Sequence, residues 1–129
     1  MGRNKRIKND TLLIGSKLEV DFYQSDSGRQ PARDWLQGLD TESRKRLGQA
    51  IRSIQMSWPV GMPLVRKFKK DLWEMRTRLP NGICRIFFTV YQQKLVLLHG
   101  LAKKSQATPL NELDLVSARL LDFRTRMKL

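Results

Sequence analysis

LWEMRTRLPNGICRIFFTVYQQKLVLLHGL, from Leu72 to Leu101, is the stretch that decides the fold. Its apolar and alternating runs are interrupted by two short turn-forming pieces, Pro80-Asn81-Gly82 and Gln92-Gln93. Turns this short join neighbouring antiparallel strands. The stretch therefore predicts three consecutive strands, over 72–78, 83–91 and 94–101. The last one is apolar on both faces, which is typical of a strand inside a covered sheet.

Shorter elements are predicted on both sides of these strands. Residues 18–24 alternate in polarity like a strand, and 31–39 and 40–58 carry apolar stripes at helical spacing. Residues 60–71 read as an irregular basic loop, and Thr108-Pro109 opens a final helix. The order β-α-α-β-β-β-α predicts an α+β domain, a small mostly antiparallel sheet with helices packed on one face.

The charge of the chain indicates its kind of partner. Twenty-five Lys and Arg against 12 Asp and Glu leave +13 on 129 residues. Such a field attracts polyanions, which favours a nucleic-acid partner over a merely solubilising surface or an anionic membrane. Residues 1–17, with five cations and one acid, predict a basic arm ahead of a domain at 18–129.

Other functional classes find little support in the composition. No apolar run approaches the roughly 20 residues that span a bilayer, so we expect a cytoplasmic protein with no membrane partner. Cys84 is the only cysteine and His99 the only histidine. Because protein metal sites are usually built from several such residues, we expect neither a metal nor a cofactor.

Strand alternation sorts the polar residues of the three strands. It places Glu74 and Arg76 on one face, with Arg85 and Phe87 on the same open face of the next strand. Two arginines beside an aromatic ring suit an RNA phosphate and a stacked base. The alternative is a pair of solvated strand arginines, one of them paired with Glu74. The basic loop adds further RNA-binding candidates: Arg66, Lys67, Phe68, Lys69 and Lys70.

The single histidine allows two interpretations. An imidazole at position 99 has the chemistry of a general base. Its strand is apolar on both sides, however, and this favours a hydrogen-bonded structural histidine.

The block from Trp73 to Glu112 also carries a family resemblance. LWEMR, then CRIFFTV, then VLLHGLAKKSQATP, and a Glu three residues after that proline, resemble the RelE/ParE superfamily and within it the phage-related HigB-type toxins. The resemblance runs over about residues 18–123 in element order and implies a RelE-like fold. It also implies the toxin of a type II toxin–antitoxin pair. Such toxins cut mRNA in the ribosomal A site without a metal, through attack of the mRNA 2′-OH on the adjacent phosphate.

The resemblance assigns roles to individual residues. Arg76 and Arg85 would hold and neutralise the scissile phosphate. Lys103 and Lys104 match a lysine pair that would stabilise the transition state or protonate the leaving 5′-oxygen. The candidates for the general base are Glu74, His99 and Tyr91. The family often has an aromatic residue where Leu101 stands here, so base stacking would fall to Phe68 or Phe87.

The implied partners are the ribosome with its mRNA and a cognate antitoxin, a helix-turn-helix protein of the HigA kind. No small-molecule cofactor is implied. Two other functions stay open from the sequence. A ParE-like toxin would bind gyrase with the same fold, and a non-catalytic module would bind RNA or the ribosome without cleaving anything.

Overall fold

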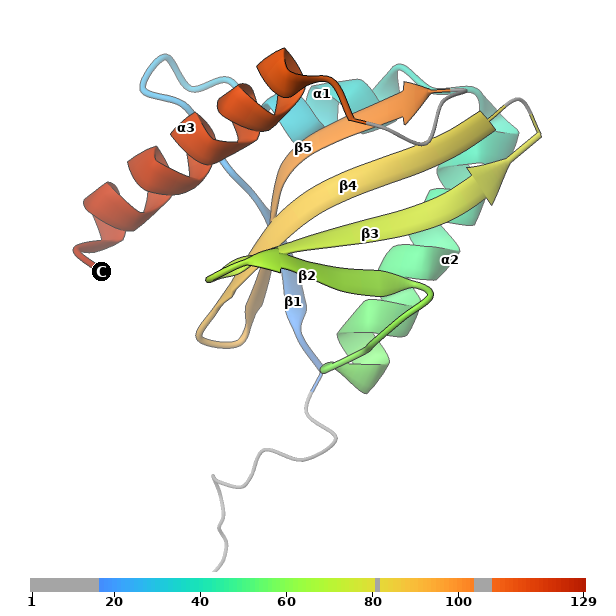
Figure 1. Ribbon diagram of the computed structural model, residues 1–129, viewed down its shortest axis with the longest axis horizontal. Helices are drawn as coiled ribbons and strands as arrows, with labels where there is room; N and C mark the ends of the chain where they lie inside the picture. The colour runs from blue at the N-terminus through green and yellow to red at the C-terminus, as the bar shows by residue number, and fades with distance from the viewer. Residues whose placement is uncertain (1–16, 81, 104–107) are drawn as a thin grey trace, which may run out of the picture.

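The computed structural model describes residues 17–80, 82–103 and 108–129, which form one sheet and three helices (Figure 1). The α+β class is therefore confirmed. Residues 1–16, most of the predicted basic arm, lie outside the described part, so the division into arm and domain stays a prediction. The elements in chain order are β1 (Glu19–Phe22), α1 (Pro31–Gln37), α2 (Thr41–Ser57), β2 (Val65–Lys69), β3 (Leu72–Leu79), β4 (Gly82–Tyr91), β5 (Lys94–Lys103) and α3 (Leu110–Met127).

The strand β2 is an addition to the predicted order. The prediction of an irregular loop over 60–71 was wrong for Val65–Lys69, which pairs with β3 in antiparallel register. Val65 lies opposite Met75 and is buried, and Phe68 packs against the second of the two cores described below. Two apolar contacts and a neighbouring strand edge outweigh the weak strand signal of this basic segment.

The sheet has the strand order β1-β5-β4-β3-β2. Among the strands of the described residues, only β1 and β5 run parallel, and the other three pairings are antiparallel, as predicted for a mostly antiparallel sheet. β5 lies between β1 and β4, and its residues 95–98 are all buried. This confirms that the strand with apolar residues on both faces lies inside the sheet.

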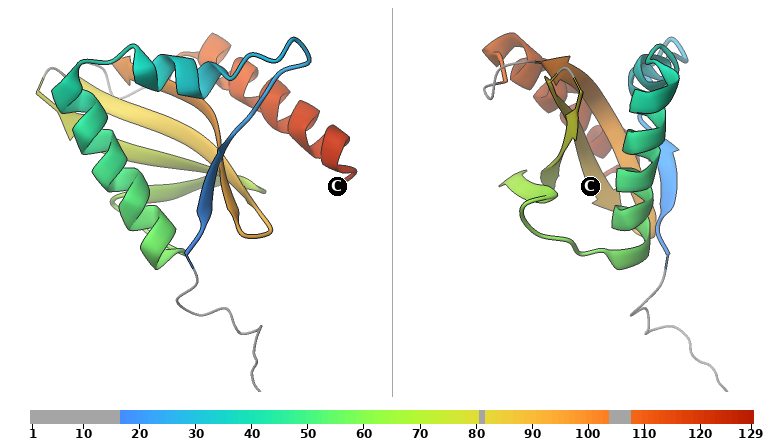
Figure 2. Two further views of the ribbon diagram at one scale, coloured as in Figure 1. Left: turned by 180° about the vertical axis from the view of Figure 1, so that it is seen from behind. Right: turned by 90° about the vertical axis from the view of Figure 1, so that its right-hand side faces the viewer.

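The prediction that the helices pack on one face was wrong. α1 and α2 cover one face of the sheet and α3 covers part of the other (Figure 2). The first core holds Leu47, Ile51 and Ile54 of α2 against inward residues such as Met75, Ile86 and Phe88. The second core holds Val116 and Leu120 of α3 against Leu72, Phe87, Val96 and Leu98. Strands that are apolar on both faces require cover on both.

Local signals explain where the helices begin and how α1 docks. The Asp40 side chain caps α2 by accepting a 3.2 Å hydrogen bond from the Ser43 amide. Trp35 of α1 packs over Gly100 of β5, where any side chain would overlap the indole ring. Within the described residues, no helix is long and apolar enough to cross a membrane.

Candidate functional site: a buried ion pair beside two strand arginines

The strand register brings the two predicted arginines together. Arg76 of β3 lies directly opposite Arg85 of β4, and Arg85 lies opposite Leu101 of β5. Directly opposed residues of antiparallel strands point to the same face with their Cβ atoms about 5 Å apart. The predicted proximity of Arg76 and Arg85 is thus confirmed, on the face that α3 partly covers.

A second row of predicted residues runs beside the first. Arg66 of β2 lies opposite Glu74, Glu74 opposite Phe87, and Phe87 opposite His99. Four strands therefore each contribute one residue to this row. The two rows lie two residues apart along β3 and β4, so their side chains point to the same face of the sheet. Six of the predicted residues therefore share this face: Arg66, Glu74, Arg76, Arg85, Phe87 and His99.

The prediction that Arg85 lies on an open face was wrong, because its side chain is only 3% exposed. Arg85 Nη1 donates a 2.7 Å hydrogen bond to Glu74 Oε2, and the Glu74 side chain is completely buried. Arg66 Nη2 lies 3.1 Å from the other oxygen, Glu74 Oε1, in an ion pair without hydrogen-bond geometry. The buried carboxylate is thus held between two guanidinium groups. Arg66 is the outer one, with its side chain 45% exposed.

Arg85 keeps unused hydrogen-bond donors in this buried position. Its Nε and Nη2 have no hydrogen-bond partner among the residues that the structure describes. These two N–H groups form one edge of the planar guanidinium, which suits two oxygens of a phosphate or carboxylate. A buried donor without a partner carries a free-energy cost of about 1–3 kcal/mol, so an unsatisfied edge calls for a functional explanation.

The predicted role of Phe87 in base stacking is also corrected. Phe87 is completely buried in the second core, and the Phe68 ring packs edge-on against it with the ring centroids 5.7 Å apart. Phe68 itself is partly exposed, and the Arg66 guanidinium lies 5.6 Å from its ring centroid. Of the two aromatic candidates, only Phe68 therefore offers surface to a base.

A β-bulge in β5 positions His99. Phe87 lies opposite His99 and the next residue, Phe88, lies opposite Leu97, so Leu98 has no partner on β4. The extra residue shifts the alternation, and the adjacent Leu98 and His99 both contact α3. The sequence pattern gives no sign of this bulge.

His99 is held by two residues of α3 that were not predicted as its partners. Arg119 Nη1 donates to His99 Nδ1 over 2.7 Å, and His99 Nε2 lies 2.6 Å from Glu112 Oε1. Because arginine has only donors, Nδ1 is the acceptor and the proton lies on Nε2, facing the carboxylate. Burial is the main cause that lowers the pKa of His99, and the nearby Arg119 charge acts in the same direction, while Glu112 opposes both.

His99 is buried and hydrogen-bonded through both ring nitrogens, as its apolar strand favours. A catalytic role for His99 is untested and stays a prediction. Glu112 stood in the sequence as part of the family motif, three residues after Pro109. Arg119 is one of several arginines in α3, and no local signal separates it from the others.

The remaining predicted residues are less closely grouped. Lys67 lies over the Trp73 ring, 5.9 Å from its centroid, and Trp73 packs on the first core. Lys69 Nζ contacts Ser117 Oγ of α3 at 2.9 Å, and Lys70 is exposed. Alternation places Lys67 on the opposite face from Arg66, so the basic segment does not form a single patch.

The lysine pair and Tyr91 complete the predicted set. The backbone of Lys103 pairs with Ile83, while Lys104 lies outside the described residues. Tyr91 contacts Phe123 at the far end of β4, six residues from Arg85 and thus about 20 Å away. This distance separates Tyr91 from the arginines, so its candidacy as a base beside them was wrong.

Metal binding and thiol chemistry find little support among the described residues. No group of three His, Cys, Asp or Glu side chains in residues 17–80, 82–103 and 108–129 is placed to hold a metal ion. Cys84 is completely buried, and burial raises the pKa of its thiol to about 12. A thiol with so high a pKa is a poor nucleophile at neutral pH.

One protein-family model matches this chain, under the description Phage derived protein Gp49-like (DUF891), over residues 34–121. The match runs from α1 into α3 and includes both rows of the candidate site. No curated protein matches the sequence. Since the model covers more than half of the chain, the protein belongs to the Gp49-like phage-derived family, a RelE/toxin-like family associated with the toxins of toxin–antitoxin systems.

Proposed function

We propose that this protein is the toxin of a type II toxin–antitoxin pair and that it cleaves mRNA on the ribosome. The observation that carries the proposal is the unsatisfied edge of Arg85, next to Arg76 on the neighbouring strand. The Arg85 edge, whose two N–H donors have no partner among the described residues, is complementary to two oxygens of a phosphodiester, and Arg76 adds a second positive charge beside it. Membership of a toxin-associated family and the charge of +13 support the same function.

In the proposed reaction the mRNA supplies its own nucleophile. The 2′-hydroxyl gives its proton to a solvent water and its oxygen attacks the adjacent phosphorus; the bond from phosphorus to the 5′-oxygen breaks, and that oxygen takes up a proton. The products are a 2′,3′-cyclic phosphate and a 5′-OH. Arg76 and Arg85 stabilise the extra negative charge on the phosphoryl oxygens in the transition state. Lys103 and Lys104 serve the leaving oxygen in this scheme.

Glu74 and His99 act as positioning residues in this proposal. The Glu74 carboxylate is bound by two guanidinium groups, and both ring nitrogens of His99 are occupied. Since these atoms are already engaged, we assign the two residues to orienting Arg85 and holding α3 against β5 rather than to abstracting the 2′-proton. Arg66 and Phe68, at the outer border of the row, are then the first residues to meet the RNA.

Primer extension on a defined mRNA in a translating extract tests the proposal. Wild type, Arg76→Ala and the control Arg33→Ala are compared with and without ribosomes; Arg33 is an exposed arginine of α1. We expect cuts in codon register, dependent on ribosomes, with wild type and the control but not with Arg76→Ala. A folded, growth-inhibiting protein that makes no cuts would contradict the proposal. DNA damage with continuing translation would then indicate a gyrase-binding toxin, and ribosome binding without cleavage a non-catalytic module.

A further inference from the structure

The end of β3 is an open sheet edge. β2 pairs with β3 from Leu72 to Met75, and the last contact of this pairing is the 2.9 Å hydrogen bond from the Arg76 amide to the Leu64 carbonyl. β3 continues to Leu79, and among the described residues its last three, 77–79, are paired with β4 alone. Backbone groups alternate in direction along a strand, so Arg78, like Arg76, directs its N–H and C=O to this open edge.

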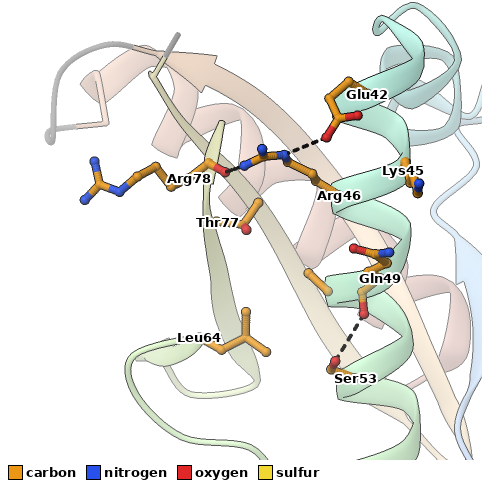
Figure 3. A pocket seen from close by; sticks show the side chains of 9 residues that line it. Glu42, Lys45, Arg46, Gln49, Ser53, Leu64, Thr77 and Arg78 are labelled. Atoms are coloured by element: carbon orange, nitrogen blue, oxygen red, sulfur yellow. Dashed lines mark hydrogen bonds and ion pairs between the residues drawn. The ribbon is translucent and has the colours of Figure 1, made fainter. Parts of the chain in front are cut away.

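Hollows flank the open edge on both faces of the sheet. One, of about 540 Å³, lies between α2 and β3 (Figure 3). The other, of about 380 Å³, lies on the far side of β3 and includes Pro63 and Ile83. Both are lined by Leu64, Thr77 and Arg78. An open strand edge with space on either face is the arrangement that accepts an added strand, whose side chains point alternately to the two faces.

Arg46 of α2 occupies this edge in the free protein. Its Nη1 donates to the Arg78 carbonyl at 3.4 Å, while its Nε donates to Glu42 at 3.0 Å (Figure 3). The guanidinium thus partly satisfies the carbonyl that an incoming strand would use. A 3.4 Å contact is long for a hydrogen bond and is weaker than a backbone ladder bond. Displacing it therefore costs little.

The charge of the lining selects the occupant. In the described part of the chain, the two hollows present four cations and a single acid: Lys45, Arg46, Arg76 and Arg78 against Glu42. An acidic segment is attracted to such a lining and a basic one is repelled. The basic residues 1–16 of this chain therefore do not match it, and a segment from another protein does.

A nucleic-acid strand fits the same surface less well. None of the described residues that line the two hollows is aromatic. Single-stranded RNA binding depends largely on bases stacked on aromatic rings. The exposed peptide groups of β3 match the backbone of an added peptide strand, whereas they offer nothing specific to RNA.

We infer that the open edge of β3 at Thr77–Leu79, with the hollow beneath α2, is a docking site for an extended acidic segment of a partner protein, which adds to the sheet as a further strand. The site requires no nuclease activity. Its test is therefore independent of the proposed function.

The test uses a fluorescein-labelled ten-residue peptide of alternating valine and glutamate, with binding to the full chain measured by fluorescence anisotropy. Arg78→Pro removes the outward amide without touching the β3–β4 ladder, and proline is tolerated at such an edge position. Arg78→Ala is the matched control, because it removes the charge and keeps the amide. We expect Arg78→Pro to weaken binding about tenfold and Arg78→Ala no more than about fivefold.

Two further measurements make the result decisive. In ¹⁵N NMR of the wild type, the peptide should slow hydrogen exchange of the Arg78 amide. Peptides N-methylated along one edge should lose binding, and those methylated along the other edge should keep it, which tests strand addition even if Arg78→Pro fails to fold. Equal loss in both Arg78 variants, no binding up to the solubility limit of the peptide, or stronger binding of a uridine decanucleotide at the same edge would overturn the inference.

Discussion

Arg85 Nη1 and Glu74 Oε2 lie 2.7 Å apart across two neighbouring strands, and both side chains are almost fully excluded from solvent. Taking two charges out of water is costly, and their attraction repays that cost only while both are present. The pair is therefore a poor source of net stability. It instead fixes the direction of the Arg85 guanidinium. The Nε–Nη2 edge of this group, which has no hydrogen-bond partner among the described residues, lies at the centre of the candidate site.

Breaking the pair from one side should destabilise the protein strongly. Glu74→Gln leaves the Arg85 charge buried without its counter-ion, and we expect a loss of about 3–5 kcal/mol in the free energy of unfolding. The double variant Glu74→Gln/Arg85→Met removes the orphaned charge and should recover at least about 1 kcal/mol of it. Urea unfolding of the single and double variants measures this. A double variant less stable than Glu74→Gln alone would show that Arg85 contributes chiefly through its other contacts.

The contact between α1 and β5 gives a second prediction. A methyl group at position 100 would overlap the Trp35 ring, so Gly100→Ala should lower the free energy of unfolding by at least about 2 kcal/mol. Gly48 in α2 is the matched control, since a methyl there meets nothing within 4 Å. Gly48→Ala should raise stability by about 0.5–1 kcal/mol, because alanine favours the helix. Shifts of the denaturant midpoint in opposite directions from the wild type would confirm the close approach of α1 to β5. Equal midpoints for the two variants would refute it.

His99 should make stability depend on pH in a particular direction. Its pKa in the folded protein is below the ordinary value of 6.5, so below that pH the unfolded chain takes up a proton more readily than the folded one. The contribution of neutral His99 to the free energy of unfolding is complete above pH 6.5 and is lost as the pH falls toward the pKa of the folded protein. Acidification should therefore destabilise the wild type relative to His99→Gln, by up to about 1.4 kcal/mol for each pH unit.

Urea unfolding of both proteins between neutral and mildly acidic pH tests this. Glutamine keeps a donor for Glu112 and an acceptor for Arg119 but does not titrate. Parallel stability curves for the two proteins would mean that His99 titrates normally and that its two hydrogen bonds to α3 do not hold it neutral.

The basic segment at β2 should control the salt dependence of RNA binding. If Lys70 neutralises a phosphate, Lys70→Ala should lower the slope of log affinity against log salt concentration by about 0.7 for single-stranded RNA. Lys67→Ala should change the slope less, because Lys67 lies on the other face, over Trp73. Filter binding of a labelled oligoribonucleotide over a salt series gives the slopes, with Arg33→Ala as the control. A slope unchanged in Lys70→Ala would show that Lys70 does not neutralise an RNA phosphate.

Much of the fold follows from local sequence. The three strands between Leu72 and Lys103 were predictable because their alternation and turn residues act over a few positions. Even the proximity of Arg76 and Arg85 follows from sequence, since a short turn allows little choice of register.

The tertiary structure alone decided which of these residues meet solvent. Alternation shows only that the two faces of a strand differ, and the cover on each face comes from segments distant in the chain. Phe87 is buried because α3 and Phe68 close over it, and Arg85 because its guanidinium pairs with the buried Glu74. The hydrogen bonds from α3 to His99 likewise depend on a bulge that forms only when β4 and β5 are paired. The sequence by itself therefore determined which residues share a face, and long-range packing determined which of them remain open to a substrate or a partner.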